Sequence, residues 1–71
     1  MNRHMEAMVG AARRKSTQSL LATHAEGRAY LAEGHLPTMW QEVMDAIETV
    51  LRERAVEIPS RYTRPAEAVA R

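Results

Sequence analysis

The sequence predicts an all-α fold: a helical hairpin with an additional N-terminal helix, which dimerises into a helix bundle and ends in an extended C-terminal arm. Residues 38–56 carry apolar side chains at spacings of three and four, and this spacing places them on one side of an α-helix. Residues 17–33, which are rich in alanine and leucine, precede this segment. Gly34 and Pro37 lie between the two segments, where they favour a turn.

The first expected helix covers residues 1–15. Asn2 is a residue type that caps helix N-termini, and the basic run of residues 13–15 suits a helix C-terminus because it opposes the partial negative charge there. The serine and threonine side chains of residues 16–19 compete with helical hydrogen bonds, so the pattern favours a break. A single helix over residues 2–33 stays open as an alternative, since neither a proline nor a glycine pair interrupts it. The apolar stripe of the first helix consists of Met5, Met8, Val9 and Ala12.

Residues 17–33 form the second expected helix. Gly27 lies beside its apolar face on a helical projection, and a glycine there is either a weak point or a place where another helix approaches closely. That broad face consists of Leu20, Leu21, Ala25, Leu31 and Ala32.

The joint after this helix carries the signals of a helical hairpin. Gly34 can end a helix in the left-handed conformation, and Pro37 disfavours helical geometry at Leu36. Thr38 and Gln41 have the spacing of a capping box, in which each side chain satisfies a free amide of the next helix. A glycine stop, a short joint and a capped helix together predict an αα-hairpin.

A chain of 71 residues allows one domain. We assign residues 1–58 to this domain and residues 59–71 to an extended or flexible basic tail. A chain this short buries only about 60% of the surface that it exposes when unfolded, and the absence of cysteine excludes disulfides. No apolar run reaches the roughly 18 residues that span a membrane, and the N-terminus has no signal-peptide core, so we expect a cytoplasmic protein without a membrane span.

The third expected helix has a wider apolar face than the rest of the chain can readily cover. The preceding helix offers three leucines, Tyr30 and several alanines, and residues 1–15 add mainly methionine and alanine. Exposed patches of that size are uncommon in monomers, so we expect two hairpins to pack face to face as a homodimer. The alternative is that the first helix covers this face and completes a monomeric three-helix bundle. The predicted protein interface consists of Met39, Trp40, Val43, Met44, Ile47 and Leu51.

Two polar residues, His24 and Arg28, fall inside the apolar arc of the second helix. One interpretation is a polar contact in the bundle core or in a groove, with a carboxylate of a partner. The simpler interpretation, which we favour, is that the arc is only half-buried and that Arg28 reaches water along its aliphatic stem.

The charges are unevenly distributed along the chain. A net charge of +1 indicates no particular partner, but both ends are basic and the polar side of residues 38–56 is acidic. Basic ends can contact nucleic-acid phosphates. If residues 18–41 formed a helix-turn-helix, however, its second helix would be the acidic one, and the phosphates would repel it. The candidate nucleic-acid contacts are Arg13, Arg14, Lys15, Arg61 and Arg64.

The sequence shows no catalytic or cofactor motif. His4, His24 and His35 are not at ligand spacing on any one helix, and there is no glycine-rich phosphate loop, HExxH or GxSxG, so we expect no metal, no cofactor and no enzymatic activity. We expect instead a small protein-binding regulator or adaptor that acts through a helical-bundle interface. The alternatives are a nucleic-acid-binding regulator and a membrane-surface role for residues 1–15. The tail is either a docking segment or a frayed terminus.

Overall fold

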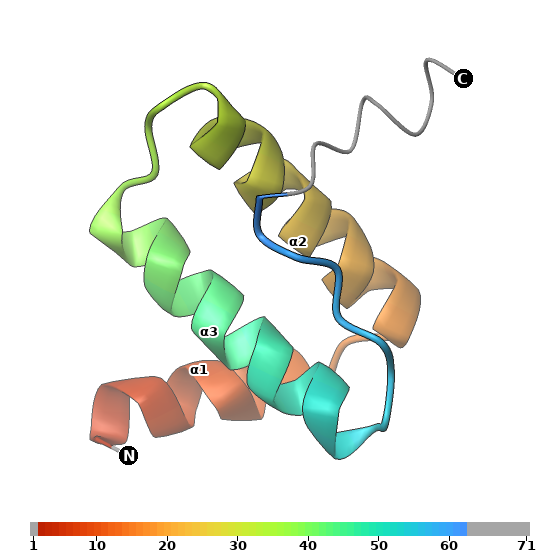
Figure 1. Cartoon of the computed structure of the whole chain (residues 1–71). Helices are drawn as coiled ribbons and strands as arrows, with labels where there is room; N and C mark the ends of the chain where they lie inside the picture. Colours follow the sequence, from red (N-terminus) through yellow and green to blue (C-terminus); the bar gives the residue numbers. More distant parts are fainter. Residues whose placement is uncertain (1, 63–71) are drawn as a thin grey trace.

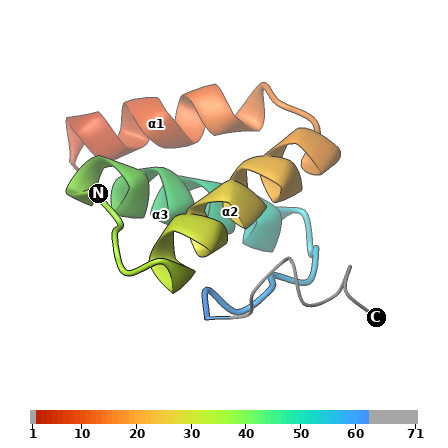
Figure 2. The ribbon, with the colours of Figure 1, turned by 90° about the horizontal axis from the view of Figure 1, so that it is seen from above.

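The computed structural model describes residues 2–62, and these form three helices without a strand: α1 (Arg3–Arg13), α2 (Thr17–Ala32) and α3 (Thr38–Glu53). Helices α2 and α3 lie side by side as a hairpin, and α1 crosses one face of the hairpin against α3 (Figure 1). Seen from above, residues 54–62 run along the opposite face (Figure 2). The predicted all-α class and the hairpin with a further N-terminal helix are confirmed.

The first two helices are separate, and a side chain caps the start of each. The Asn2 Oδ1 atom accepts a hydrogen bond from the Met5 amide at 2.7 Å, and the Ser16 Oγ atom accepts one from the Ser19 amide at 3.1 Å. Ser16 is extended, as N-cap residues are. The break that the serines and threonines predicted is therefore present, and the single-helix alternative is wrong.

The predicted capping box at the start of α3 does not form. Pro37 occupies the N-cap position without a side-chain hydrogen bond, and Thr38 is already the first helical residue. Gln41 donates instead from Nε2 to the Leu36 carbonyl at 3.2 Å. Because proline takes the cap position, the threonine hydroxyl stands one residue too late to accept from the free amides.

Helix α2 ends as predicted, with Gly34 at a φ of 86°. The Gly34 amide donates to the Leu31 carbonyl, and the His35 amide donates to the Tyr30 carbonyl, both at 3.1 Å. These bonds satisfy two carbonyls that the end of the helix would otherwise leave free.

Helix α3 uses the same stop without a glycine. Ala55 has a φ of 57°, its amide donates to the Arg52 carbonyl, and the next amide, that of Val56, donates to the Leu51 carbonyl. The helix thus ends at Glu53, three residues before the predicted end. A left-handed alanine is strained, and the half-buried Val56 packs against the core and helps to hold it there.

The core lies between α3 and the other two helices, and it corrects the predicted interface. Met44, Ile47 and Leu51 are only 0%, 3% and 0% exposed within the single chain. The prediction that these three side chains lie on a surface is wrong, because Met44 packs against α2 at Gly27 and Ile47 and Leu51 pack in the cluster that includes Val9 and Ala12 of α1. The buried apolar residues are Val9, Ala12, Leu20, Met44, Ala46, Ile47, Val50 and Leu51.

Gly27 is a point of close approach between α2 and α3, the second of the two predicted interpretations. A Cβ atom at this position would lie 2.5 Å from the Met44 Sδ atom and 3.0 Å from its Cγ atom. The missing side chain therefore makes the space that the fully buried Met44 fills. The buried line of α2 is Leu20, His24 and Gly27, so Ala32, which is exposed, does not belong to it.

Residues 54–62 pack against the hairpin. Val56 and Ile58 are half-buried against the core, and Arg61 binds two carboxylates of α3. Residues 59–62 are the described part of the predicted tail, and here the chain is held against the domain. Arg64 and the rest of the tail lie outside the described residues.

Candidate functional site

A polar network joins α2, α3 and the C-terminal segment, and it includes the fully buried His24. The His24 Nε2 atom lies 2.9 Å from the Glu48 Oε2 atom. The polar contact in the core, which was the less favoured interpretation, is therefore present, but its carboxylate comes from the same chain and not from a partner. The favoured interpretation of a half-buried arc is wrong for His24. Arg28, one turn further along α2, is half-buried.

Arg61 completes the network from the other side. Its Nε atom donates to Glu48 Oε2 at 2.8 Å and its Nη2 atom to Glu48 Oε1 at 3.1 Å, and Nη2 also bonds the Asp45 carboxylate. Burial raises the pKa of Glu48, but the hydrogen bonds from Arg61 and His24 together outweigh it and hold the pKa below its ordinary value. The same hydrogen bond to Glu48 raises the pKa of Arg61.

The ionised carboxylate of Glu48 determines which ring nitrogen of a neutral His24 carries the proton. An ionised carboxylate accepts from both neighbours, so the proton of a neutral His24 belongs on Nε2. The His24 Nδ1 atom is buried and has no hydrogen-bond partner among residues 2–62. None of His24, Asp45, Glu48 and Arg61 lines either of the two cavities described below, and the network holds the C-terminal segment on the hairpin.

Four of the five predicted nucleic-acid contacts lie within the described residues, in two groups on opposite faces of the hairpin. Arg13 donates from Nε and Nη2 to the Glu53 carboxylate at 3.0 Å and 2.6 Å, and this hydrogen bond lowers the pKa of Glu53. Arg61 is bound as described above. Arg14 and Lys15 are exposed at the end of α1. Arg61 therefore lies apart from Arg13, Arg14 and Lys15 (Figure 2).

Arg54 holds the joint between α1 and α2, a role that the sequence reasoning missed. Its Nη1 atom donates to the Thr17 hydroxyl at 3.0 Å, and its Nη2 atom donates to the backbone carbonyls of Arg13 at 3.1 Å and Lys15 at 2.9 Å. No sequence signal indicated that Arg54 reaches a joint 37 residues away.

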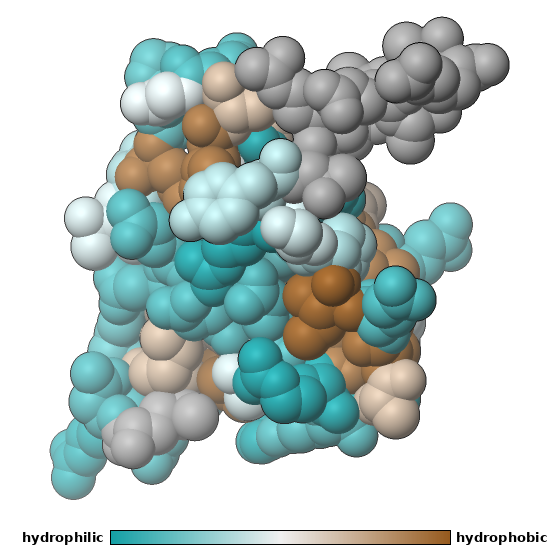
Figure 3. Space-filling model, in the orientation of Figure 1, coloured by the Kyte–Doolittle hydropathy of each residue, from teal (hydrophilic) through white to brown (hydrophobic). Residues whose placement is uncertain are grey.

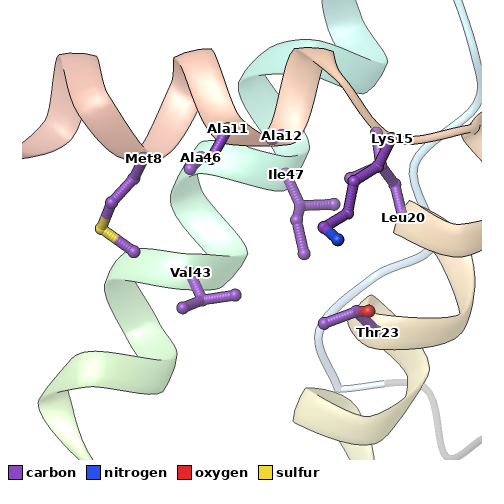
Figure 4. A pocket seen from close by; sticks show the side chains of 9 residues that line it. All are labelled: Met8, Ala11, Ala12, Lys15, Leu20, Thr23, Val43, Ala46 and Ile47. Carbon is purple, nitrogen blue, oxygen red and sulfur yellow. The ribbon is translucent and has the colours of Figure 1, made fainter.

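A groove opens between α2 and α3 beneath α1 (Figure 4), with a volume of about 200 Å³. Met8 and Val43 lie at one end, Ile47 lies in the middle, and Lys15 and Thr23 lie at the α2 side. Of the six predicted interface residues, Val43 and Ile47 contribute to it. The complete lining is Met8, Ala11, Ala12, Lys15, Leu20, Thr23, Val43, Ala46 and Ile47.

A second, aromatic surface lies at the turn of the hairpin. The rings of Tyr30 and Trp40 meet edge to face, with centroids 5.3 Å apart and planes at 66°. They line a shallow cavity of about 290 Å³ together with His35 and Pro37. Trp40 is half-buried and Met39 is 71% exposed, so these two side chains belong to the part of the predicted interface that stays at the surface.

Figure 3 shows the side on which residues 54–62 lie, and its apolar patches are separated by hydrophilic side chains. Across residues 2–62, no three His, Cys, Asp or Glu side chains are grouped to hold a metal ion. In the same part of the chain, no helix is both long and apolar enough to cross a membrane.

Comparison with protein-family models, with curated proteins and with solved structures finds no match to this chain. The functional argument therefore depends on the geometry of the chain itself.

Proposed function

We propose that this chain is a small, non-enzymatic protein-binding regulator or adaptor, and that it binds through the groove between α2 and α3 beneath α1. One observation carries the proposal: an open, mainly apolar groove is lined by side chains from all three helices. Protein partners insert apolar anchor residues into such depressions. Within the described residues, His24, Glu48 and Arg61 bond one another, and Arg61 thereby holds residues 54–62 on the hairpin.

The surface around the groove supports a protein partner. Val43 is half-buried in the groove, and Met39, one turn earlier on α3, is 71% exposed. Methionine side chains are enriched at interfaces, whereas Trp40, the next residue, lines the separate cavity at the hairpin turn. This side of the molecule thus combines apolar side chains from α1 and α3 over adjoining turns.

A homodimer is one form of this proposal. With Met44, Ile47 and Leu51 buried in the chain, its interface would consist of Met39, Trp40 and Val43 with their neighbours. A standard interface buries about 800 Å² on each partner, which is more than three side chains supply. We therefore place a different protein ahead of a second copy.

The geometry gives less support to the nucleic-acid alternative. Arg13 and Arg61 are already paired with carboxylates of the same chain, and a phosphate would have to displace Glu53 or Glu48 to reach them. Arg14 and Lys15 alone make a small basic patch.

Photo-crosslinking from defined positions tests the proposal. Because the chain contains no cysteine, a single introduced cysteine can carry a benzophenone. Ala7→Cys places it on exposed surface one turn before the groove residue Ala11, and Ser60→Cys is the matched control on the opposite face. The labelled protein is irradiated in a lysate of the source organism, with and without excess unlabelled chain.

The proposal predicts a discrete product from Ala7→Cys that unlabelled chain suppresses, that Ala11→Phe abolishes by filling the groove, and that Ser60→Cys does not give. A product of twice the mass of the chain, formed by the purified protein alone, would identify the homodimer. The same products from both positions, or none from Ala7→Cys, would contradict the proposal.

A further inference from the structure

We propose that the groove receives one apolar side chain from a helix of a partner protein, and that Lys15 pairs with a carboxylate of the same helix. This inference rests on the proposed function and names the chemistry of the partner. It combines three properties of the groove: its size, its apolar lining and the position of its one charged residue.

The size of the groove indicates an anchor side chain and not a small molecule. Its volume is about 200 Å³, whereas pockets for small ligands and cofactors are usually about 300–1,000 Å³. The groove is also open to the surface, so a helix backbone can remain outside while one residue enters. A leucine, isoleucine or phenylalanine would meet Val43 and Ile47 on α3 and Met8 on α1.

The charge of the groove indicates which partner fits. Lys15 is the one charged residue among the nine that line it, and its ammonium group points into the cavity above Thr23 (Figure 4). Arg14 is exposed beside it, while the charge of Arg13 is compensated by Glu53. Electrostatic complementarity therefore selects an acidic neighbour for the anchor residue and rejects a basic one.

Two helical peptides of about fifteen residues serve as probes. They share one amphipathic sequence with a central leucine and differ at one position, one turn from that leucine, which is glutamate in the first and lysine in the second. Each is titrated into the isotopically labelled full chain, and the amide shifts of Ala11, Thr23 and Ala46 report occupation of the groove. The titrations are repeated with Lys15→Glu and with Arg14→Glu, which changes the same charge outside the groove.

The inference predicts that the glutamate peptide binds roughly three- to tenfold more tightly than the lysine peptide, the range expected for one exposed charge pair replaced by a repulsion. Lys15→Glu should reverse this preference and Arg14→Glu should leave its direction unchanged. Equal affinities for the two peptides, or no shift of the groove amides by either at millimolar concentration, would overturn the inference. The proposed function would still stand if the crosslink from Ala7→Cys were specific, and it would fall separately if that crosslink were absent.

Discussion

Replacing Glu48 with alanine should lower the free energy of unfolding by about 1–4 kcal/mol. The variant leaves His24, which is 0% exposed, without a partner on either nitrogen, because Nδ1 has none among the described residues. An unsatisfied buried polar group costs about 1–3 kcal/mol. Arg61 would still bond Asp45, and its side chain is 25% exposed. Losing the ion pair between Arg61 and Glu48 therefore adds about 1 kcal/mol or less.

This loss would be a large part of the total stability, since a chain of 71 residues has about 4–10 kcal/mol to lose. Urea unfolding followed by the fluorescence of Trp40 gives the difference directly. Glu26→Ala is the control, because Glu26 is exposed on α2 and should change stability by less than about 0.5 kcal/mol. The reasoning would be refuted if Glu48→Ala were no more costly than Glu26→Ala.

The same network predicts how stability depends on pH. The folded-state pKa of Glu48 lies below its ordinary value of 4.5, so its contribution is fully present above pH 4.5 and is lost as the pH falls through the folded-state pKa. Wild-type protein should therefore lose stability below about pH 4.5 more steeply than Glu48→Gln, which carries no titrating carboxylate at that position. Parallel slopes for the two proteins would contradict the assigned pairing.

Three further predictions concern backbone and joint geometry. Gly27→Ala should destabilise by about 0.5–2 kcal/mol, because overpacking against Met44 outweighs the gain of about 1 kcal/mol in helix propensity; in a Met44→Ala background the same change should become stabilising, and an unchanged sign in a double-mutant cycle would argue against the contact. Ala55→Gly should stabilise by about 0.5–1 kcal/mol by relieving a left-handed alanine, whereas Gly34→Ala should destabilise by a similar amount; thermal melts of the two variants that shift in the same direction would disprove the shared helix stop. Arg54→Ala should cost about 1–3 kcal/mol through its three hydrogen bonds and should speed amide exchange at the joint between α1 and α2, and a loss confined to α3 would contradict that role.

The local structure was largely predictable because its causes are local. Asn2, Ser16 and Gly34 act through hydrogen bonds and backbone preferences within a few residues of themselves, so the sequence pattern predicted two helix starts and one helix stop. The capping box failed for an equally local reason, since Pro37 had taken the cap position. The left-handed Ala55 was not predictable, because packing of Val56 compensates for its strain.

The site was less predictable because its contacts join residues far apart in the chain. His24 was recognised as polar within an apolar arc, but Glu48 had been assigned to the solvent face of its helix. Only the return of Arg61 along the hairpin turns that position into part of a half-buried network. The groove forms only because α1 crosses α3, and the helical periodicity of residues 1–15 does not predict that crossing.

The position dependence of crosslinking tests the account most directly. A benzophenone on Ala7→Cys should give one competable protein product that disappears when Ala11→Phe fills the groove, while the same label on Ser60→Cys gives none. The account would be contradicted if filling the groove left the product unchanged, because the contact would then lie elsewhere on the molecule.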